Sequence, residues 1–176
     1  MTLNLLRHGE PEGGRLYRGN LVDNPLTEKG WQQMLTSTAG KQWDFIATSP
    51  MIRCRAFAQH LSQTQNIEMK IFEQLEEIGF GDWQGRSAQE IGQKIVEEFK
   101  QNPIKNRPKG AENLLNFQKR VLSVFKKIIR IKNNQSVLII AHAGVIRVIK
   151  SHLLNLPIEK MFTIKVISAS CERFKL

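Results

Sequence analysis

Side chains that can handle a phosphate group follow three separate apolar runs of this sequence. Arg7 and His8 come directly after an apolar run near the N-terminus. Arg53 lies shortly after a second run, and His142 follows the continuous apolar run 137–141. Arginine binds phosphate oxygens in pairs, and a neutral histidine is a good nucleophile near pH 7. Together these residue types indicate phosphoryl-transfer chemistry.

A carboxyl pair, Glu76 and Glu77, supplies the remaining group that such a reaction needs. The pair lies a few residues beyond a third apolar run at 67–71. A protonated carboxyl can protonate the alkoxide that leaves when a phosphate ester is cleaved. Each residue alone also has an ordinary structural explanation, as a hydrogen-bonded histidine, an ion-paired arginine or a solvated carboxylate. Their occurrence together, in this order, favours a phosphate-transfer site.

The apolar patterns also predict the elements that position these side chains. Strands are expected at 3–6, 43–48, 67–71, 137–141, 162–167 and 171–174. Helices are expected after a Thr27 cap, after a Ser49–Pro50 cap, after a capping box at Ser87–Glu90, over 114–129 and over 144–154. The alternation predicts one α/β domain over 1–176, a three-layer sandwich with a mostly parallel sheet and helices on both faces. Ligands of such sheets bind beyond the carboxyl ends of the strands, where the side chains above lie.

Composition limits the other classes of function. The 176 residues carry a net charge of +10, but no basic run exceeds two residues and only 7% are aromatic, so no nucleic-acid partner is expected. No apolar run reaches the ~20 residues of a membrane span, and the N-terminus lacks the pattern of a secretory signal. The two cysteines, Cys54 and Cys171, lack ligand-like spacing. Reduced thiols and a cytoplasmic location are therefore expected, without a membrane partner.

Five segments resemble, in the same order, the motifs of the histidine phosphatase superfamily, the phosphoglycerate mutase-like proteins. They are Leu5–Glu10, Asp23–Gly30, Ser49–Arg53, Leu75–Gly85 and Ala141–Arg147. The resemblance extends from residue 3 to about residue 150. The Phe-Gly-Asp-Trp form of the fourth motif, at 80–83, is most similar to the α-ribazole phosphatase branch, which acts in building the cobalamin nucleotide loop.

The resemblance implies a role for each matched residue. His8 would be the nucleophile that becomes phosphorylated. Glu77, rather than its neighbour, would protonate the leaving group and then activate the water that hydrolyses the phosphohistidine. Arg7, Arg53 and His142 would bind the phosphoryl oxygens. The resemblance implies no metal and no cofactor, and the sequence shows no aspartate cluster suited to Mg²⁺.

Selection of the substrate would depend on residues outside this set. Arg18, Gly19 and Trp83 are candidates, since an arginine can meet ribose or phosphate oxygens, a glycine N–H can meet phosphate, and an indole can pack on a flat ring. The alternative for Trp83 is that it packs its loop onto the core. The segment near 80–112 is expected to form a lid. Gly14 stands where many relatives have an asparagine that contacts the phosphate, so that contact is not expected here.

The leading interpretation is a phosphomonoester hydrolase that takes a small phosphorylated substrate, with α-ribazole 5′-phosphate as the first choice. A broad-specificity phosphatase and a phosphoglycerate mutase are the alternatives among enzymes, and a chain of 176 residues is shorter than the mutases, which favours hydrolysis. A non-catalytic phosphate-binding or interaction module is the alternative from another class. The presence of all five reactive residues together argues against it.

Overall fold

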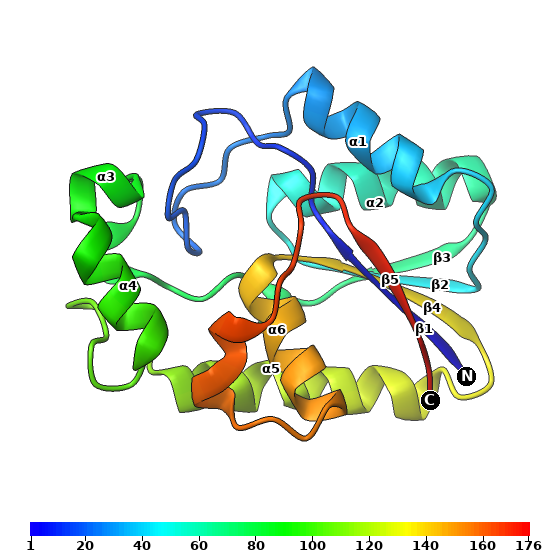
Figure 1. Ribbon diagram of the computed structural model, residues 1–176. Coiled ribbons are helices and arrows are strands. Elements are labelled where there is room, and N and C mark those ends of the chain that lie inside the picture. Colours follow the sequence, from blue (N-terminus) through cyan, green and yellow to red (C-terminus); the bar gives the residue numbers. More distant parts are fainter.

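A five-stranded sheet forms the centre of the computed structural model, which describes residues 1–176 (Figure 1). The strand order is β3-β2-β4-β1-β5, and only β5 is antiparallel to its neighbour. The strands are β1 (Thr2–Arg7), β2 (Phe45–Thr48), β3 (Glu68–Ile71), β4 (Ser136–Ala141) and β5 (Cys171–Lys175). Because β1 and β2 both pair in parallel with β4, the carboxyl ends of these three strands lie side by side.

Helices cover both faces of this sheet, as Figure 1 shows. The helices α1 (Glu28–Thr38) and α2 (Ile52–Gln65) lie on one face, and α5 (Leu114–Ile131) and α6 (Ala143–Leu153) lie on the other. The predicted three-layer α/β architecture is therefore confirmed. None of the helices combines the length and the apolar character that crossing a membrane would require.

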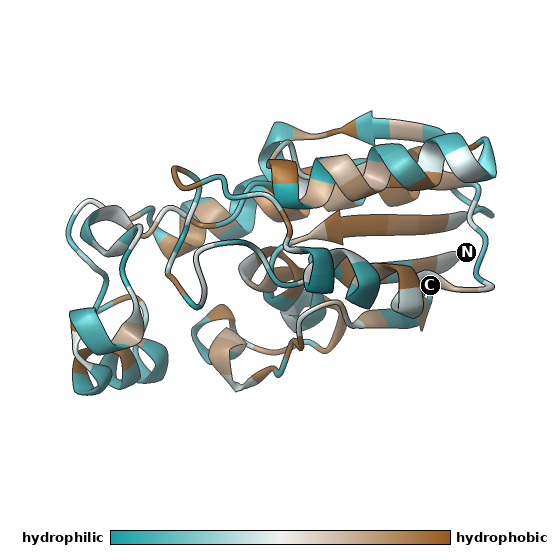
Figure 2. Ribbon diagram, turned by 90° about the horizontal axis from the view of Figure 1, so that it is seen from above, coloured by the Kyte–Doolittle hydropathy of each residue, from teal (hydrophilic) through white to brown (hydrophobic).

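The core is divided into two clusters by the sheet. Leu3 and Leu5 of β1 pack with α5 and α6, whereas Leu6 of the same strand packs with α1 and α2. The residues of β4 alternate in the same way, with Ile139 on the first side and Ile140 on the second. Successive side chains of a strand point to opposite faces, so a strand covered on both faces is apolar throughout. Figure 2 shows a central strand in brown, whereas the helices carry both teal and brown residues.

Three local expectations are wrong, and long-range contacts explain two of them. Residues 162–167 do not form a strand: the short 3₁₀ helix η3 (Ile158–Thr163) is followed by irregular chain, whose carbonyl groups accept hydrogen bonds from arginine side chains instead of a strand. The helix expected after Ser87 is interrupted at Gly92, where φ is +108°, so it becomes α3 (Ala88–Ile91) and α4 (Gln93–Gln101). The third concerns the start of α2.

Ser49 and Pro50 do not start α2. The helix begins at Ile52, whose N–H donates to both carboxylate oxygens of Asp23 at 2.9 and 3.1 Å. The cap is thus supplied by a side chain from a distant loop, and the Ser49 hydroxyl accepts a hydrogen bond from Met51 N–H, just before the helix, at 3.3 Å. The Thr27 cap is confirmed, because its hydroxyl accepts a hydrogen bond from Gly30 N–H.

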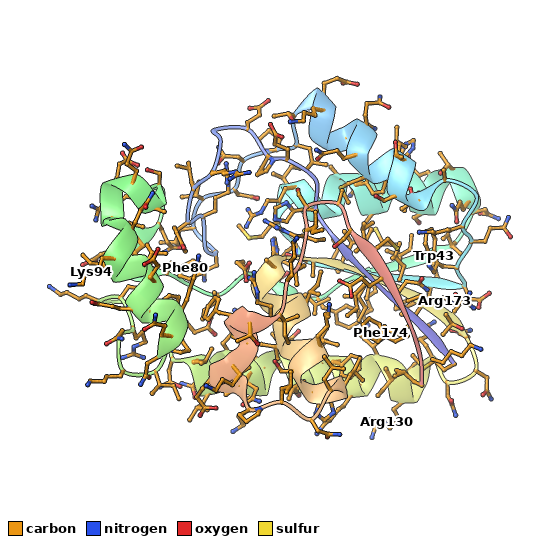
Figure 3. All side chains as sticks on the ribbon, in the orientation of Figure 1. Trp43, Phe80, Lys94, Arg130, Arg173 and Phe174 are labelled. Atoms are coloured by element: carbon orange, nitrogen blue, oxygen red, sulfur yellow. The ribbon has the colours of Figure 1, made fainter.

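Segment 80–112 forms a unit at one end of the sheet, to the left in Figure 1. It contains the 3₁₀ helix η2 (Gly81–Trp83), α3 and α4, and α4 packs against η3. In Figure 3, Phe80 lies on the side of this unit that faces the rest of the molecule, whereas Lys94 points away from it. Both Phe80 and Trp83 belong to the larger core cluster. Closure of this segment as a lid stays a prediction.

Candidate active site

The two predicted histidines meet at the carboxyl end of the sheet. His8 follows β1 directly, and His142 stands between β4 and the start of α6. The centres of their rings are 5.3 Å apart, and their side chains are 7% and 0% exposed. Arg53 reaches the same place from the first turn of α2. The parallel pairing of β1 and β2 with β4 brings these three residues together.

The ring of His8 is neutral and held in one orientation. Its Nδ1 lies 2.8 Å from the carbonyl oxygen of Gly9, which can only accept a hydrogen bond, so Nδ1 carries the proton. Burial, reinforced by the charge of Arg53, lowers the pKa of His8 to about 3. The second nitrogen, Nε2, therefore keeps a free lone pair at neutral pH. This is the form of histidine that can attack phosphorus.

Two guanidinium groups, one buried and one half-buried, make the site electropositive. Arg53 is 1% exposed and donates to the carbonyl groups of Gly19 and Val22 at 3.1 and 3.0 Å. Arg7 donates to the carbonyl of Val166 at 2.8 Å. In both arginines Nε is buried without a hydrogen-bond partner. Carbonyl groups orient both cations, and Arg53 also has a longer ion pair, at 3.5 Å, with the half-exposed carboxylate of Asp23. Most of the positive charge is thus left for an anion.

His142 is oriented by Ser49. The Nε2 atom of His142 lies 2.7 Å from the Ser49 hydroxyl oxygen, which also accepts a hydrogen bond from Met51 N–H. Burial, together with the nearby charge of Arg53, holds the pKa of His142 well below its usual value, so this ring is neutral too. Cys54 packs against the same ring, and burial raises the pKa of its thiol. Sequence reasoning assigned Ser49 to a helix cap and therefore missed this contact.

Glu77, and not Glu76, reaches the histidine end of the site. Its carboxylate accepts hydrogen bonds from Ile78 N–H at 3.0 Å and from Gly144 N–H at 3.1 Å, at the first turn of α6. A Cβ on Gly144 would lie 2.2 Å from a carboxylate oxygen of Glu77, so a larger residue here would displace the carboxylate from this position. The N-terminal end of a helix stabilises a nearby negative charge. The carboxyl of Glu76 instead lies beside the Asn20 side chain, and partial burial raises the pKa of this carboxyl.

The three predicted substrate-binding residues have contacts within the protein. Arg18 donates to the carbonyl groups of Glu12 and Gly14 and to the side chain of Asn24, so it holds its loop together. The carbonyl of Gly19 accepts a hydrogen bond from Arg53, as described above. The ring of Trp83 is 7% exposed and packs edge-on against Tyr17 and Phe99. For Trp83 the packing alternative describes its contacts, and contact with a substrate stays a prediction for all three.

Arg147 is a residue near the site that sequence reasoning did not single out. It lies on α6, and its Nε donates to the carbonyl of Ile164 at 3.1 Å. Burial lowers its pKa, and the charge of Glu77 and the hydroxyl of Tyr17 oppose that shift. Its position one turn into α6, inside the last matched motif, is the signal that would have found it. No group of three or more His, Cys, Asp or Glu side chains is arranged to hold a metal ion.

Comparison with known proteins agrees with this geometry. The family model described as histidine phosphatase superfamily (branch 1) matches residues 3–176. The adenosylcobalamin/alpha-ribazole phosphatase of Escherichia coli K12 is 27% identical over 94% of this chain and 85% of the relative. Phosphoserine phosphatase 1 of Hydrogenobacter thermophilus is 27% identical over 97% and 84%. The crystal structure of the alpha-ribazole phosphatase from Shigella flexneri, 26% identical, superposes with a TM-score of 0.83 over 100% of this chain and 91% of that one. The chain is a phosphatase and belongs to branch 1 of the histidine phosphatase superfamily.

Proposed function

We propose that this enzyme hydrolyses phosphomonoesters in two steps, through a phosphoryl group held on His8. The observation that carries the proposal is the neutral ring of His8, which has its proton fixed on Nδ1 and its Nε2 lone pair free. The ring lies beside the charge of Arg53 and against the ring of His142. A nucleophile that is uncharged, oriented and surrounded by cations is suited to attack a phosphate dianion.

In the first step Nε2 of His8 forms a bond to phosphorus while the bond to the ester oxygen breaks. The departing oxygen takes its electron pair with it and receives a proton from the carboxyl group of Glu77. Arg7, Arg53 and the ring of His142 stabilise the negative charge of the transferring oxygens. Their anchoring by carbonyl groups and by Ser49 means that little reorganisation is needed during the reaction.

In the second step a water molecule attacks phosphorus and the bond to Nε2 breaks. The carboxylate of Glu77 takes a proton from this water, which restores the carboxyl group for the next cycle. Inorganic phosphate leaves and the His8 ring returns to its starting form. The chemistry uses only side chains of this chain, so exhaustive chelation with EDTA is expected to leave kcat unchanged.

As the preferred substrate we propose α-ribazole 5′-phosphate. One support is the similarity to the Escherichia coli relative named adenosylcobalamin/alpha-ribazole phosphatase. The other is the aromatic rim formed by Tyr17, Phe80 and Trp83, on which a flat base could pack. A phosphomonoester that also bears a carboxylate, such as phosphoserine, is the second candidate. Arg147 favours it, because this additional guanidinium lies within electrostatic reach of Arg7 and Glu77.

A panel of esters tests the choice. We expect kcat/KM for α-ribazole 5′-phosphate to exceed the values for phosphoserine, 3-phosphoglycerate and p-nitrophenyl phosphate by about 10-fold or more, equivalent to ~1.4 kcal/mol of differential transition-state binding. A preference for phosphoserine that is lost in Arg147→Met would support the second candidate. Equal efficiency with all four esters would leave a broad-specificity phosphatase. Interconversion of 3- and 2-phosphoglycerate at a rate above hydrolysis would indicate a mutase.

A further inference from the structure

Arg120 links the segment that carries Glu77 to Glu112 through all the hydrogen-bond donors of its side chain. From α5, its NH1 group donates to the carbonyls of Gln74 and Glu76 at 2.8 and 3.0 Å. Its NH2 group donates to the carbonyl of Glu77 at 3.2 Å. The remaining bonds, from Nε and NH2, reach the two carboxylate oxygens of Glu112 at 2.7 and 2.8 Å. An arginine has five N–H donors, and all five have partners here.

Glu112 holds the same segment at Gly79, which follows Glu77 in the chain. Its carboxylate accepts a hydrogen bond from Gly79 N–H at 3.3 Å, and its own N–H donates to the Gly79 carbonyl at 2.8 Å. The backbone of 74–79 is thus tied to Arg120 before Glu77 and to Glu112 after it. The side chains of the pair are 24% and 22% exposed, and the guanidinium also stacks on the ring of Phe117 at 4.8 Å.

The segment 74–79 is anchored in the core by Leu75 and Ile78, but Glu77 between them makes no backbone–backbone hydrogen bond. Apart from the single 3₁₀ turn η1 (Glu73–Leu75) it has no regular structure, and it lies beyond the edge strand β3. The carboxylate of Glu77 must nevertheless meet Gly144 N–H at the start of α6, and a misplacement of about 1 Å is enough to cost a catalytic group much of its effect. Core packing thus holds the segment at Leu75 and Ile78, and the long-range hydrogen bond from Arg120 fixes the backbone at Glu77 itself.

We propose that Arg120 and Glu112 are positioning residues for proton transfer by Glu77. The proposal rests on the proposed function, in which Glu77 protonates the leaving group. Because the two charges of the pair compensate each other, its contribution is the geometry of the acid segment, not the field at the site. Loss of the pair should thus impair the one step that needs an accurately placed proton, and should leave attack by His8 on the phosphate largely intact.

The test compares two esters that differ in how much their leaving groups need a proton. p-Nitrophenolate leaves without protonation, whereas the alkoxide of an alkyl phosphate such as α-ribazole 5′-phosphate does not. The parameter is kcat/KM, because it reports the steps up to release of the leaving group and excludes hydrolysis of the phosphoenzyme. We expect Glu112→Gln and Arg120→Lys to lower kcat/KM for the alkyl ester by about 30-fold or more, and that for p-nitrophenyl phosphate by less than about 3-fold.

Controls separate this proposal from a general loss of structure. Lys119→Met changes the exposed neighbour of Arg120, which makes no hydrogen bond or ion pair, and is expected to leave both values unchanged. Glu112→Gln keeps the shape of the side chain and one acceptor oxygen, so it remains informative if Arg120 variants fail to fold. Equal losses with both esters, or no loss with either, would overturn the proposal.

Two further measurements complete the test. Glu77→Gln must show the same dependence on the leaving group; if it does not, the proposed role of Glu77 fails, whatever the result for Arg120. The second measurement is chemical rescue of Arg120→Ala. Arg120 borders a surface cavity of about 350 Å³ that it shares with Gln74, Lys119 and Ser123, so guanidinium ion can enter from solution. Guanidinium at non-denaturing concentration is expected to restore the alkyl-ester rate selectively, and restoration of neither rate or of both equally would contradict the proposal.

Discussion

The strand-end cluster (His8, Arg53 and His142) and segment 80–112 are positioned by different means. Each member of the cluster is at most 7% exposed and is fixed by the parallel strands or by backbone carbonyls. Segment 80–112 is held at the end of the sheet by packing of aromatic rings, chiefly Trp83 and Phe99, and is built from short helices. The groups proposed to handle the phosphoryl group thus lie at the ends of central strands and in the first turn of α2, whereas the rim proposed to meet the leaving group is a separately packed unit.

This difference implies that substitutions in the two regions change different quantities. A change in the strand-end cluster should lower the rate with every ester, because each ester presents the same phosphoryl group. A change in segment 80–112 should alter the ratio of rates between esters.

Substitution of the nucleophile tests the cluster most severely. We expect His8→Ala to lower kcat by about 10⁴-fold or more with every ester, because both proposed steps pass through Nε2 of His8. His152→Ala removes an exposed histidine of α6 and serves as the control, with kcat within about 2-fold of the unchanged enzyme. Steady-state release of phosphate measures both. Substantial activity in the His8 variant would remove the basis for a phosphohistidine mechanism.

The buried arginine provides the next test. Arg53→Lys keeps the positive charge. A lysine ammonium cannot donate to the carbonyls of Gly19 and Val22 and, at the same time, donate two parallel hydrogen bonds to phosphate oxygens. We expect kcat/KM to fall by about 10²- to 10³-fold, and by the same factor for an alkyl ester and for p-nitrophenyl phosphate. A loss confined to one class of ester would show that Arg53 contacts the leaving group, and would break the division between the two regions.

Acid should destabilise the cluster through its neutral histidines. Burial lowers the pKa of His8 to about 3 from a reference value of 6.5, so the unfolded chain binds more protons than the folded one between these values. The stabilisation is therefore complete above pH 6.5 and is lost as the pH falls toward 3, at about 1.4 kcal/mol per pH unit for His8 alone. Urea unfolding at pH 7, 6 and 5 measures this, and His8→Gln should reduce the slope. An unchanged slope would contradict burial of a neutral His8.

The smallest expected effect concerns segment 80–112. Trp83→Ala removes a ring that packs against Tyr17 and Phe99 at the rim. We expect the preference for α-ribazole 5′-phosphate over p-nitrophenyl phosphate to fall by about 3- to 10-fold, while the rate with the smaller ester changes by less than about 2-fold. Ile95→Ala, on the exposed side of α4, is the matched control. Equal losses with both esters would place Trp83 with the strand-end cluster in function.

Local sequence patterns located all five strands of the sheet, with one additional strand at 162–167 that the structure lacks, and they indicated the convergence of the main site residues. Apolar runs located β1, β2, β3, β4 and β5, and parallel pairing then requires the residues after β1 and β4 to be neighbours. The choice of Glu77 over Glu76 came from resemblance alone, and the contact with Gly144 N–H agrees with it. The packing of that carboxylate against a glycine is visible only in three dimensions.

What the sequence did not reveal depends on contacts between distant segments. Asp23 caps α2 from a loop that precedes α1, so the local Ser-Pro pattern indicated the wrong cap. Alternation at 162–167 is typical of a strand, yet Arg7 and Arg147 engage carbonyl groups there. The attachment of Arg120 to 74–77 joins α5 to the acid segment, and no periodicity within either segment indicates it.

The central claim is that a phosphoryl group passes through Nε2 of His8, and rapid quenching tests it most directly. The enzyme is mixed with a ³²P-labelled ester, quenched in alkali within the first turnover, digested and analysed by mass spectrometry. We expect an acid-labile, base-stable phosphoryl group on the peptide that contains His8, formed and lost at rates that account for turnover, and absent from His8→Ala. A phosphoryl group on another residue would contradict the account. So would a His8→Ala variant that turns over the ester without forming any phosphoenzyme.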